Sequence, residues 1–174
     1  MSLRRAARGF TLIELLVVVA IAGVLLVLAL PSMQDVVVTN RMKTLSLDLY
    51  TSLTLARSEA VKRNTGNISM VAASGGWQNG WTVCVDSNAN GACNSGEPVL
   101  IQGEAVHSSL TLTGPAGNIV TYNRDGRATT GTASFKITAG TNNTRSPMRC
   151  VDINASGRPN TRADTNGTDS DGCN

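Results

Sequence analysis

The sequence predicts an α+β fold: a long N-terminal helix, membrane-spanning in its first half, packed on a C-terminal antiparallel β-sheet or sandwich. Three observations predict it. The chain opens with an apolar run preceded by arginines, an amphipathic stretch follows, and short β-branched runs between turn residues fill the rest. We expect the membrane helix at 10–30, its amphipathic continuation at 31–65 and one globular β domain at 66–174.

The apolar run from Phe10 to Leu30 contains 21 residues, with Thr11 and Glu14 as its clearly polar side chains. At about 1.5 Å per residue, such a helix spans about 30 Å, the thickness of a bilayer core. Three arginines precede the run, which predicts a cytoplasmic N-terminus and an exported C-terminal domain. A cleaved secretory signal is disfavoured because the run is too long and no small-residue A-x-A site follows it. A plain single-span anchor stays open on these grounds.

The carboxylate of Glu14 points to a function for this helix. Placing a carboxylate inside a membrane costs about 2.5–3.5 kcal/mol on insertion scales, so such a residue usually serves a partner or a reaction. Glu14 lies four residues after Phe10. Cleavage between Gly9 and Phe10 would create an amine that could neutralise the Glu14 of a neighbouring copy.

The segment Gly9-Phe10-Thr11-Leu12-Ile13-Glu14-Leu15-Leu16 resembles the class III signal of type IV pilins and type II secretion pseudopilins. The resemblance implies a leader at residues 1–9, a prepilin peptidase that cuts after Gly9, and methylation of the new Phe10 amine. It also implies that Glu14 is the assembly glutamate and that Pro31 kinks the helix.

The stretch after Pro31 keeps a helical period. Its apolar residues recur every three or four positions, which predicts one face covered by the β domain. We expect a kink or a short break near Pro31, which lacks an amide donor, and a stop at Asn64-Thr65-Gly66. The apolar stripe comprises Met42, Leu45, Leu49, Leu53, Ala56 and Ala60.

The region after Gly66 consists of short β-branched runs bounded by turn residues. Residues 124–127 are expected to form a turn between two strands, and residues 156–174 to be irregular. The expected strands are Asn67–Ala72, Trp81–Val85, Val99–Gln102, Ser109–Thr113, Ile119–Asn123, Ala133–Ala139 and Arg149–Asn154.

Several later segments narrow the resemblance. Residues 55–63, 79–83, 86–97, 125–127 and 156–158 are similar to the minor subunits FimT, FimU and GspH. The resemblance implies a non-enzymatic minor pilin that helps to initiate or assemble a type IV pilus, with other pilins as partners. A minor pseudopilin of a type II secretion system is the alternative. Either protein would sit in the inner membrane with its C-terminal domain in the periplasm, and then in the fibre.

Four cysteines, Cys84, Cys93, Cys150 and Cys173, are an even number in a chain whose second part we expect to be exported. None has the C-x-x-C spacing of a zinc or redox site, so two disulfides are the simplest interpretation. Of the three possible pairings, we favour Cys84–Cys93 and Cys150–Cys173 because each closes a local loop.

The segment from Asp86 to Glu97 matches the calcium-loop pattern D-x-[DN]-x-[DN]-G-x5-E. Alternating oxygen ligands, a glycine at the sharp turn and a bidentate glutamate would suit calcium. Flanking strands and few charges favour an ordinary turn-rich hairpin loop instead. Calcium is thus the one cofactor to consider, with Asp86, Asn88, Asn90, Ala92, Asn94 and Glu97 as candidate ligands.

A second candidate site is a set of arginines near the C-terminus. Arginine binds phosphate well, and FimT-like proteins are associated with DNA capture through a C-terminal GRxR element. Here Gly157-Arg158 is followed by an arginine only at position 162. From Phe10 onward the chain has 12 basic and 12 acidic residues, which argues against a general nucleic-acid coat. The candidates for double-stranded DNA are Arg145, Arg149, Arg158 and Arg162; ordinary surface arginines are the alternative.

The sequence gives little support for catalysis. His107 is its single histidine and lies in a serine-containing segment without triad or metal spacing. We therefore predict no catalytic residues.

Overall fold

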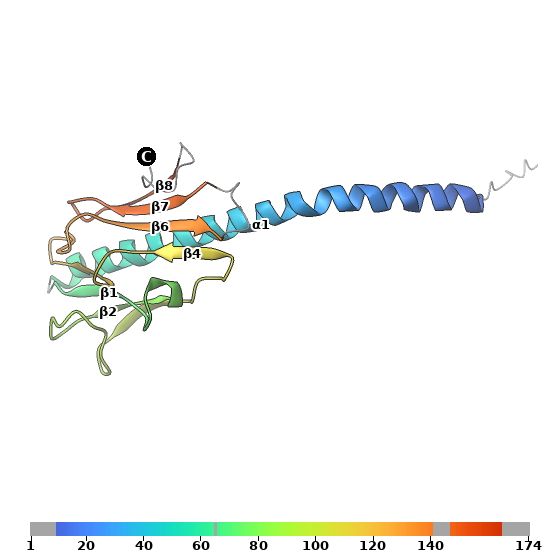
Figure 1. Ribbon diagram of the computed structural model, residues 1–174. Helices are drawn as coiled ribbons and strands as arrows, with labels where there is room; N and C mark the ends of the chain where they lie inside the picture. Colours follow the sequence, from blue (N-terminus) through green and yellow to red (C-terminus); the bar gives the residue numbers. More distant parts are fainter. Residues whose placement is uncertain (1–9, 65, 141–146, 165–174) are drawn as a thin grey trace, which may run out of the picture. The chain divides into compact units, whose positions relative to one another are not determined.

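The computed structural model describes residues 10–64, 66–140 and 147–164 of the 174-residue chain. The chain divides into two compact units, Met1–Val37 and Val38–Asn174, and each is described by itself. One helix, α1 (Leu12–Arg63), contributes to both units. The second unit adds two antiparallel β-sheets, which Figure 1 shows beside the C-terminal half of α1.

Helix α1 is continuous through Pro31, so the expected break is absent from the described backbone. Proline removes one amide donor, but its fixed φ is compatible with a helix, and the bonds on either side maintain it. The helix ends at Arg63, where Asn64 takes a left-handed φ of 51°. The predicted stop is therefore confirmed.

The core of the second unit lies between α1 and the two sheets. Both sheets contribute to it: Val83 and Val120 come from one, Phe135 and Ile137 from the other. The helix contributes the predicted apolar stripe, which is buried at every position: Met42, Leu45, Leu49, Leu53, Ala56 and Ala60. Repetition at three and four residues places these side chains on one face, which confirms the predicted period.

The first sheet has the strand order β3-β2-β1-β5. Strands β1 and β2 pair as a hairpin with Ile68 opposite Val85, and β5 adds to the free side of β1. The short 3-10 helix η1 (Trp77–Asn79) lies within the β1–β2 connection. The strands are β1 (Ile68–Ala72), β2 (Trp81–Val85), β3 (Val99–Gly103) and β5 (Ile119–Tyr122).

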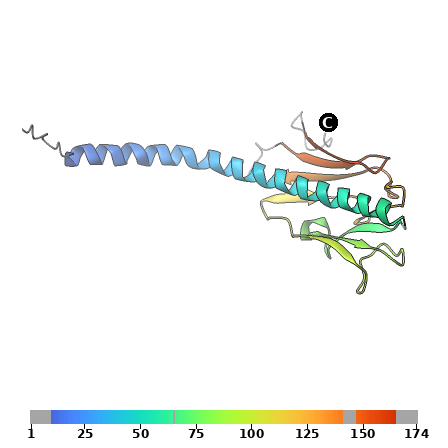
Figure 2. The ribbon, with the colours of Figure 1, turned by 180° about the vertical axis from the view of Figure 1, so that it is seen from behind.

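The second sheet has the order β4-β6-β7-β8. Its strands are β4 (Leu110–Thr113), β6 (Ala133–Ala139), β7 (Arg149–Ile153) and β8 (Pro159–Ala163). Seen from behind in Figure 2, α1 has one sheet on each side. Strand β8 corrects the expected irregular segment at residues 159–163, whereas residues 165–174 of that segment lie outside the described residues. The sequence of β8 is polar and begins with proline, which suits an edge strand, and pairing with β7 fixes it.

Side chains of η1 and β2 connect the layers of the globular unit. The buried Trp81 indole donates to the Ser52 hydroxyl of α1 at 3.0 Å. The Trp77 ring meets Phe135 of β6 edge to face, with ring centroids 4.8 Å apart. Gln78 both donates to the Leu110 carbonyl and accepts the Leu112 amide. These contacts hold the two sheets and the helix in one fixed arrangement.

Candidate functional site

The N-terminus of α1 is built by the same residues that the sequence singled out. The carbonyl of Thr11 accepts the Leu15 amide, and its hydroxyl accepts the Glu14 amide at 3.3 Å. Thr11 is thus an N-cap with a glutamate three residues later, the spacing of a capping box. Sequence analysis missed this role, although T-x-x-E is its signal. Phe10 and Glu14 are exposed, and Gly9 lies outside the described residues.

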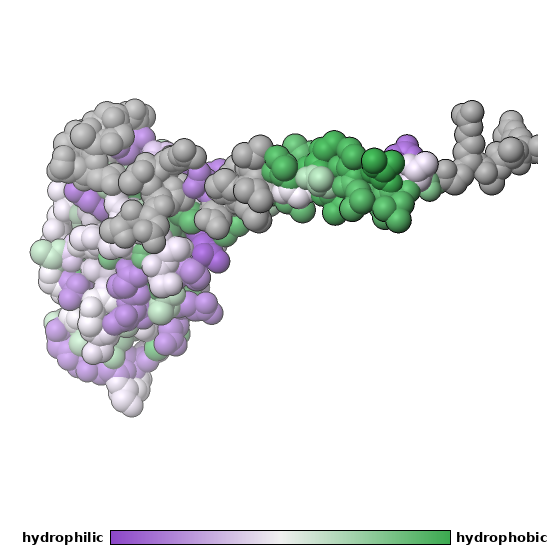
Figure 3. Space-filling view, turned by 45° about the vertical axis from the view of Figure 1, so that its right-hand side comes forward, coloured by the Kyte–Doolittle hydropathy of each residue, from purple (hydrophilic) through white to green (hydrophobic). Residues whose placement is uncertain are grey.

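The first part of α1 exposes apolar side chains over its whole surface. Phe10, just before the helix, is 82% exposed, Leu12 and Ile13 are 77% and 70% exposed, and the large apolar side chains that follow as far as Leu26 stay above one half. Figure 3 shows this part of the helix as an almost unbroken hydrophobic surface. In the described residues, none of the helices combines the length and the hydropathy required to span a membrane.

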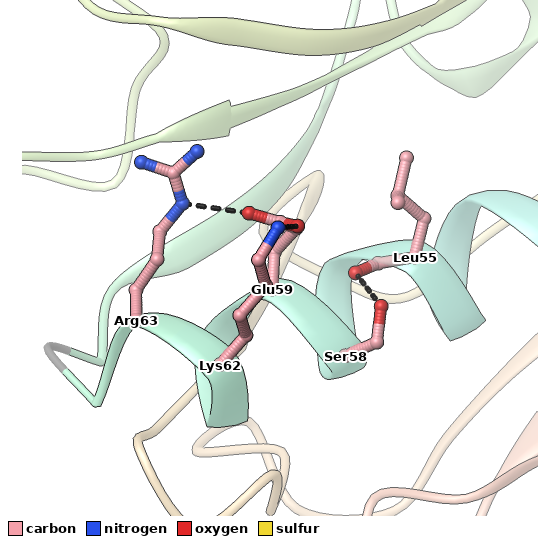
Figure 4. Close-up of polar contacts among 5 residues, drawn as sticks. All are labelled: Leu55, Ser58, Glu59, Lys62 and Arg63. Atoms are coloured by element: carbon pink, nitrogen blue, oxygen red, sulfur yellow. Dashed lines mark hydrogen bonds and ion pairs between the residues drawn. The ribbon is translucent and has the colours of Figure 1, made fainter.

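The C-terminal end of α1 carries a local ion-pair group, drawn in Figure 4. Glu59 accepts from Lys62 at 3.0 Å and from Arg63 at 2.7 Å. Hydrogen bonds from Arg63 and then Lys62 lower the pKa of Glu59. The Ser58 hydroxyl donates a hydrogen bond to the Leu55 carbonyl. Cations at the C-terminal end of a helix also interact favourably with the helix dipole. Stabilisation of this helix end therefore accounts for Glu59, Lys62 and Arg63.

The loop between β2 and β3 holds the candidate calcium ligands, and its carboxylates accept backbone amides. Asp86, which is buried, accepts the amides of Asn90 and Gly91 at 3.1 and 2.8 Å. Glu97 accepts those of Ser87 and Asn94, both at 2.8 Å. The Asn94 amide is the first cause of a lowered pKa of Glu97. The loop is therefore closed by its own charge-assisted hydrogen bonds.

The oxygen atoms of the candidate calcium ligands take part in hydrogen bonds within the loop. Each carboxylate oxygen of Asp86 and Glu97 already accepts a backbone amide, while Asn88 and Asn90 form turns by accepting amides two residues later. Among the described residues, no group of three or more His, Cys, Asp or Glu side chains is placed to hold a metal ion. These hydrogen bonds account for the turn residues of the loop, and calcium binding by it stays a prediction.

The predicted Cys84–Cys93 disulfide is present and joins β2 to this loop. Cys84 is fully buried, so the bridge anchors the loop to the core. The second predicted pair includes Cys173, which lies outside the described residues. Its expected partner Cys150 is buried and is not a free thiol.

Two turns of the globular unit share one construction, the pattern N-x-x-G-R. In the first, the Asn123 side-chain oxygen accepts the amides two and four residues later; in the second, Asn154 does the same, and all four distances are 2.9–3.1 Å. The backbone N–H of each asparagine also donates to the backbone carbonyl of the arginine that ends its turn, Arg127 or Arg158. The first turn follows β5, and the second joins β7 to β8.

The two turns pack directly on each other and on α1. A Cβ atom on Gly157 would overlap the Gly126 carbonyl oxygen and lie 3.0 Å from Arg127 Cα. Arg57 of α1 donates to that same Gly126 carbonyl at 2.9 Å. A Cβ on Gly126 would approach Val61 to 2.9 Å. Both glycines have φ above +70°, so glycine meets a conformational and a steric requirement at each position.

This packing groups the arginines differently from the sequence prediction. Arg158 is exposed and lies next to Arg127, with Arg124 in the same turn as Arg127; we call these three residues the arginine cluster. None of their side chains forms a hydrogen bond or ion pair within the described residues. Sequence analysis missed Arg124 and Arg127, although the repeated N-x-x-G-R pattern was a signal for them.

The other predicted arginines are placed elsewhere. Arg162 pairs with Asp152 at 2.6 Å, since both project from the same face of β7 and β8. Arg149 is half-buried at the start of β7. Arg145 lies outside the described residues. Of the predicted set, Arg158 is thus the described member that is both exposed and without a partner in the described parts of the chain.

Comparison with known proteins agrees with this architecture. Residues 46–157 match the family described as type II transport protein GspH, and residues 4–30 match the prokaryotic N-terminal methylation motif. A helix with this N-terminal motif, packed on antiparallel sheets, defines the class of type IV minor pilins and pseudopilins. Because the GspH match covers more than half of the chain, the protein belongs to the GspH family. It is a structural subunit rather than an enzyme.

Solved structures share the fold at low sequence identity. The minor pilin FimU of Pseudomonas aeruginosa superposes with a TM-score of 0.57 at 22% identity, covering 74% of this chain and 96% of that structure. The minor pseudopilin EpsH of the Vibrio cholerae type 2 secretion system gives 0.53 at 14% identity, covering 71% and 97%. At these identities the likeness shows the fold alone.

Curated relatives match over shorter stretches. The pilin-like protein PilA1 of Thermus thermophilus is 43% identical over 95 residues, which cover 52% of this chain and 55% of PilA1. The fimbrial protein EcpC of Eikenella corrodens is 50% identical over 40 residues, or 23% of this chain and 26% of EcpC. The chain therefore spans about half the length of the first relative and about a quarter of the second.

Proposed function

We propose that this protein is a minor pilin that enters the inner membrane through residues 10–30 and then packs by α1 among other pilins in a type IV pilus. Prepilin peptidase cleaves it after Gly9, and the Phe10 amine is methylated. The Glu14 carboxylate then pairs with the N-terminal amine of a neighbouring subunit during assembly. The globular unit faces the periplasm before assembly and the fibre surface afterwards.

The observation that carries the proposal is the exposed apolar surface of Phe10 and of α1 as far as Leu26, which lies within the match to the N-terminal methylation motif. Apolar surface of this extent is unfavourable in water, because each Å² costs about 25 cal/mol. Lipid or the helices of neighbouring subunits would cover it. Glu14 favours coverage by the helices of neighbouring subunits, since a carboxylate within an apolar helix surface needs a cationic partner.

The test is incorporation of Glu14 variants into fibres. Glu14→Leu should still insert, be cleaved and be methylated, which mass spectrometry of the N-terminal peptide detects, but it should be lost from sheared fibres. Ile13→Leu is the matched control, an apolar change in an equally exposed neighbour that keeps the carboxylate. Normal incorporation of Glu14→Leu, or a mature N-terminus other than methylated Phe10, would refute the proposal.

A minor pseudopilin is the alternative within the same family, and the assay for it is genetic. If the protein serves a pilus, loss of the gene should abolish surface piliation, and the wild-type chain should restore it. Loss of exported enzyme activity with normal piliation would assign it to a type II secretion system instead.

The arginine cluster favours a second candidate function, DNA capture by the fibre. Arg124, Arg127 and Arg158 belong to two turns whose backbones are in contact, and their side chains have no partner in the described chain. Exposed, unpaired guanidinium groups attract phosphate. Asp125 in the same turn reduces this local charge. Sequence-independent binding through phosphate contacts is therefore the form of recognition to test.

The assay is a titration of labelled double-stranded DNA with the globular unit, disulfides intact, at several salt concentrations. Arg127→Ala with Arg158→Ala should reduce the affinity and flatten its dependence on salt. Arg162→Ala is the matched control, because that arginine is already paired with Asp152. Equal affinities for wild type and the double variant, or no binding at low salt, would remove DNA capture through this cluster.

A further inference from the structure

The connection between β3 and β4, residues 104–109, is attached to α1 through one histidine. The Nδ1 atom of His107 lies 3.2 Å from an Arg41 guanidinium nitrogen of α1. The same Nδ1 lies 2.9 Å from the Ser109 hydroxyl and 3.1 Å from the Ser109 backbone nitrogen. Arg41 also donates to the Ser109 hydroxyl at 3.3 Å.

The two N–H groups that face Nδ1, from the Ser109 backbone and the Arg41 guanidinium, determine the protonation of the His107 ring. A backbone N–H and an arginine N–H can only donate, so the Nδ1 atom that faces both must be an unprotonated acceptor. His107 is therefore neutral in this arrangement, with its proton on Nε2. The tautomer follows from the partners of Nδ1.

We propose that His107 is an acid-sensitive latch that holds residues 107–109 against α1 while its Nδ1 atom is unprotonated and releases them when Nδ1 takes up a proton. A proton on Nδ1 removes the acceptor that Ser109 and Arg41 share. It also places a second positive charge beside the Arg41 guanidinium. The neutral contact thus becomes a repulsive one.

Within the described residues, Arg41 is the charged group that contacts the His107 side chain. The other charged side chains of the elements that meet here are Lys43 of α1 and Lys136 of β6, and the carboxylates Asp48 of α1 and Glu104 of the connection. Those two carboxylates act on each other, and no hydrogen bond or ion pair joins either one to His107 within the described residues. Strand β4 and η1 carry no ionisable side chain.

The structure defines how far the release extends. On one side of the corner, the Val106 amide donates to the Gln78 carbonyl at 2.9 Å; on the other, the Gly140 amide donates to the Ser109 carbonyl at 2.8 Å. These backbone bonds do not titrate, so the loop stays attached at both ends. Protonation of Nδ1 therefore releases the side-chain contacts of the corner with Arg41, while its backbone bonds remain.

The first test uses the full-length protein in detergent micelles and the ¹⁵N signals of its single histidine, which need no assignment among several rings. At pH 7.5 the ring should be the neutral tautomer with the proton on Nε2. A proton on Nδ1 at this pH would overturn the proposal without any variant.

The second test is amide hydrogen exchange of residues 104–109 at pH 7.5 and pH 5, corrected for the intrinsic effect of pH on exchange. The Ser109 amide should exchange several-fold faster at pH 5 in the wild type. His107→Asn keeps an acceptor near the Nδ1 position but does not titrate, so its corrected rate should be the same at both pH values. Arg41→Gln should show a smaller pH effect than wild type. The same pH effect in wild type and His107→Asn would overturn the latch.

Discussion

The backbone contact between the two N-x-x-G-R turns makes Gly157→Ala a sensitive probe of the packing. The added Cβ would overlap the Gly126 carbonyl oxygen, and it would lie 3.0 Å from Arg127 Cα and 3.1 Å from the Ala128 nitrogen. All three are backbone atoms, which cannot rotate away as the end of a side chain can. The turn, or the Arg57 contact behind it, must therefore shift.

Two terms set the magnitude of this effect. The φ of Gly157 is +78°, and holding a residue with a Cβ in the left-handed region costs about 1–2 kcal/mol. Overpacking against fixed atoms adds about 1–3 kcal/mol. We therefore expect Gly157→Ala to lower the free energy of unfolding of the globular unit by about 2–5 kcal/mol, the sum of these two ranges.

A matched control separates the two terms. Gly131 has the same φ of +78°, but a Cβ placed there meets nothing within 4 Å. Gly131→Ala should therefore show the conformational cost alone, and both variants restrict the unfolded chain equally. Urea unfolding can be followed by the fluorescence of the buried Trp77 and Trp81. Equal destabilisation by the two substitutions would refute the contact between the turns.

Three further predictions concern charges and the disulfide. Hydrogen bonds, above all that of the Asn94 backbone amide, lower the pKa of Glu97 in the folded protein. The Glu97 carboxylate therefore stabilises the fold above about pH 4.5, and this contribution is lost as the pH falls through the pKa of the folded state. Glu97→Gln should lower the Tm at pH 7 but much less at pH 3. Burial and then Glu104 raise the pKa of Asp48, so its charged form opposes folding above that value. Asp48→Asn should raise the Tm at pH 7 and have little effect at pH 3; a lower Tm at pH 7 would contradict this. Replacing the two cysteines of the Cys84–Cys93 bridge, which are 9 positions apart, by serine should cost about 2–3 kcal/mol in urea unfolding; an unchanged midpoint would contradict it.

Calcium binding by the Asp86–Glu97 loop stays a prediction with a direct test. Glu97 accepts the amides of Ser87 and Asn94, so a calcium ion bound by its carboxylate should move the NMR signals of these amides and raise the Tm. Unchanged signals and an unchanged Tm with calcium or a chelator would leave the loop as a hydrogen-bonded structure.

The sequence by itself determined the features that depend on local order. The eight-residue motif at Gly9, the apolar run and the buried stripe from Met42 to Ala60 are all readable as composition and period. The helix stop after Arg63 and seven of the strands were also predictable, because turn residues and β-branched runs act over a few positions.

The tertiary structure decided what depends on contacts between distant residues. Strand β8, with the sequence Pro-Asn-Thr-Arg-Ala, has no apolar alternation, and it is a strand because the edge of β7 offers it hydrogen bonds. The same pairing places Arg162 beside Asp152, while the contact of Gly157 with Gly126 places Arg158 beside Arg127. Spacing along the chain cannot determine these neighbours, because they belong to different strands whose pairing is set by the whole core.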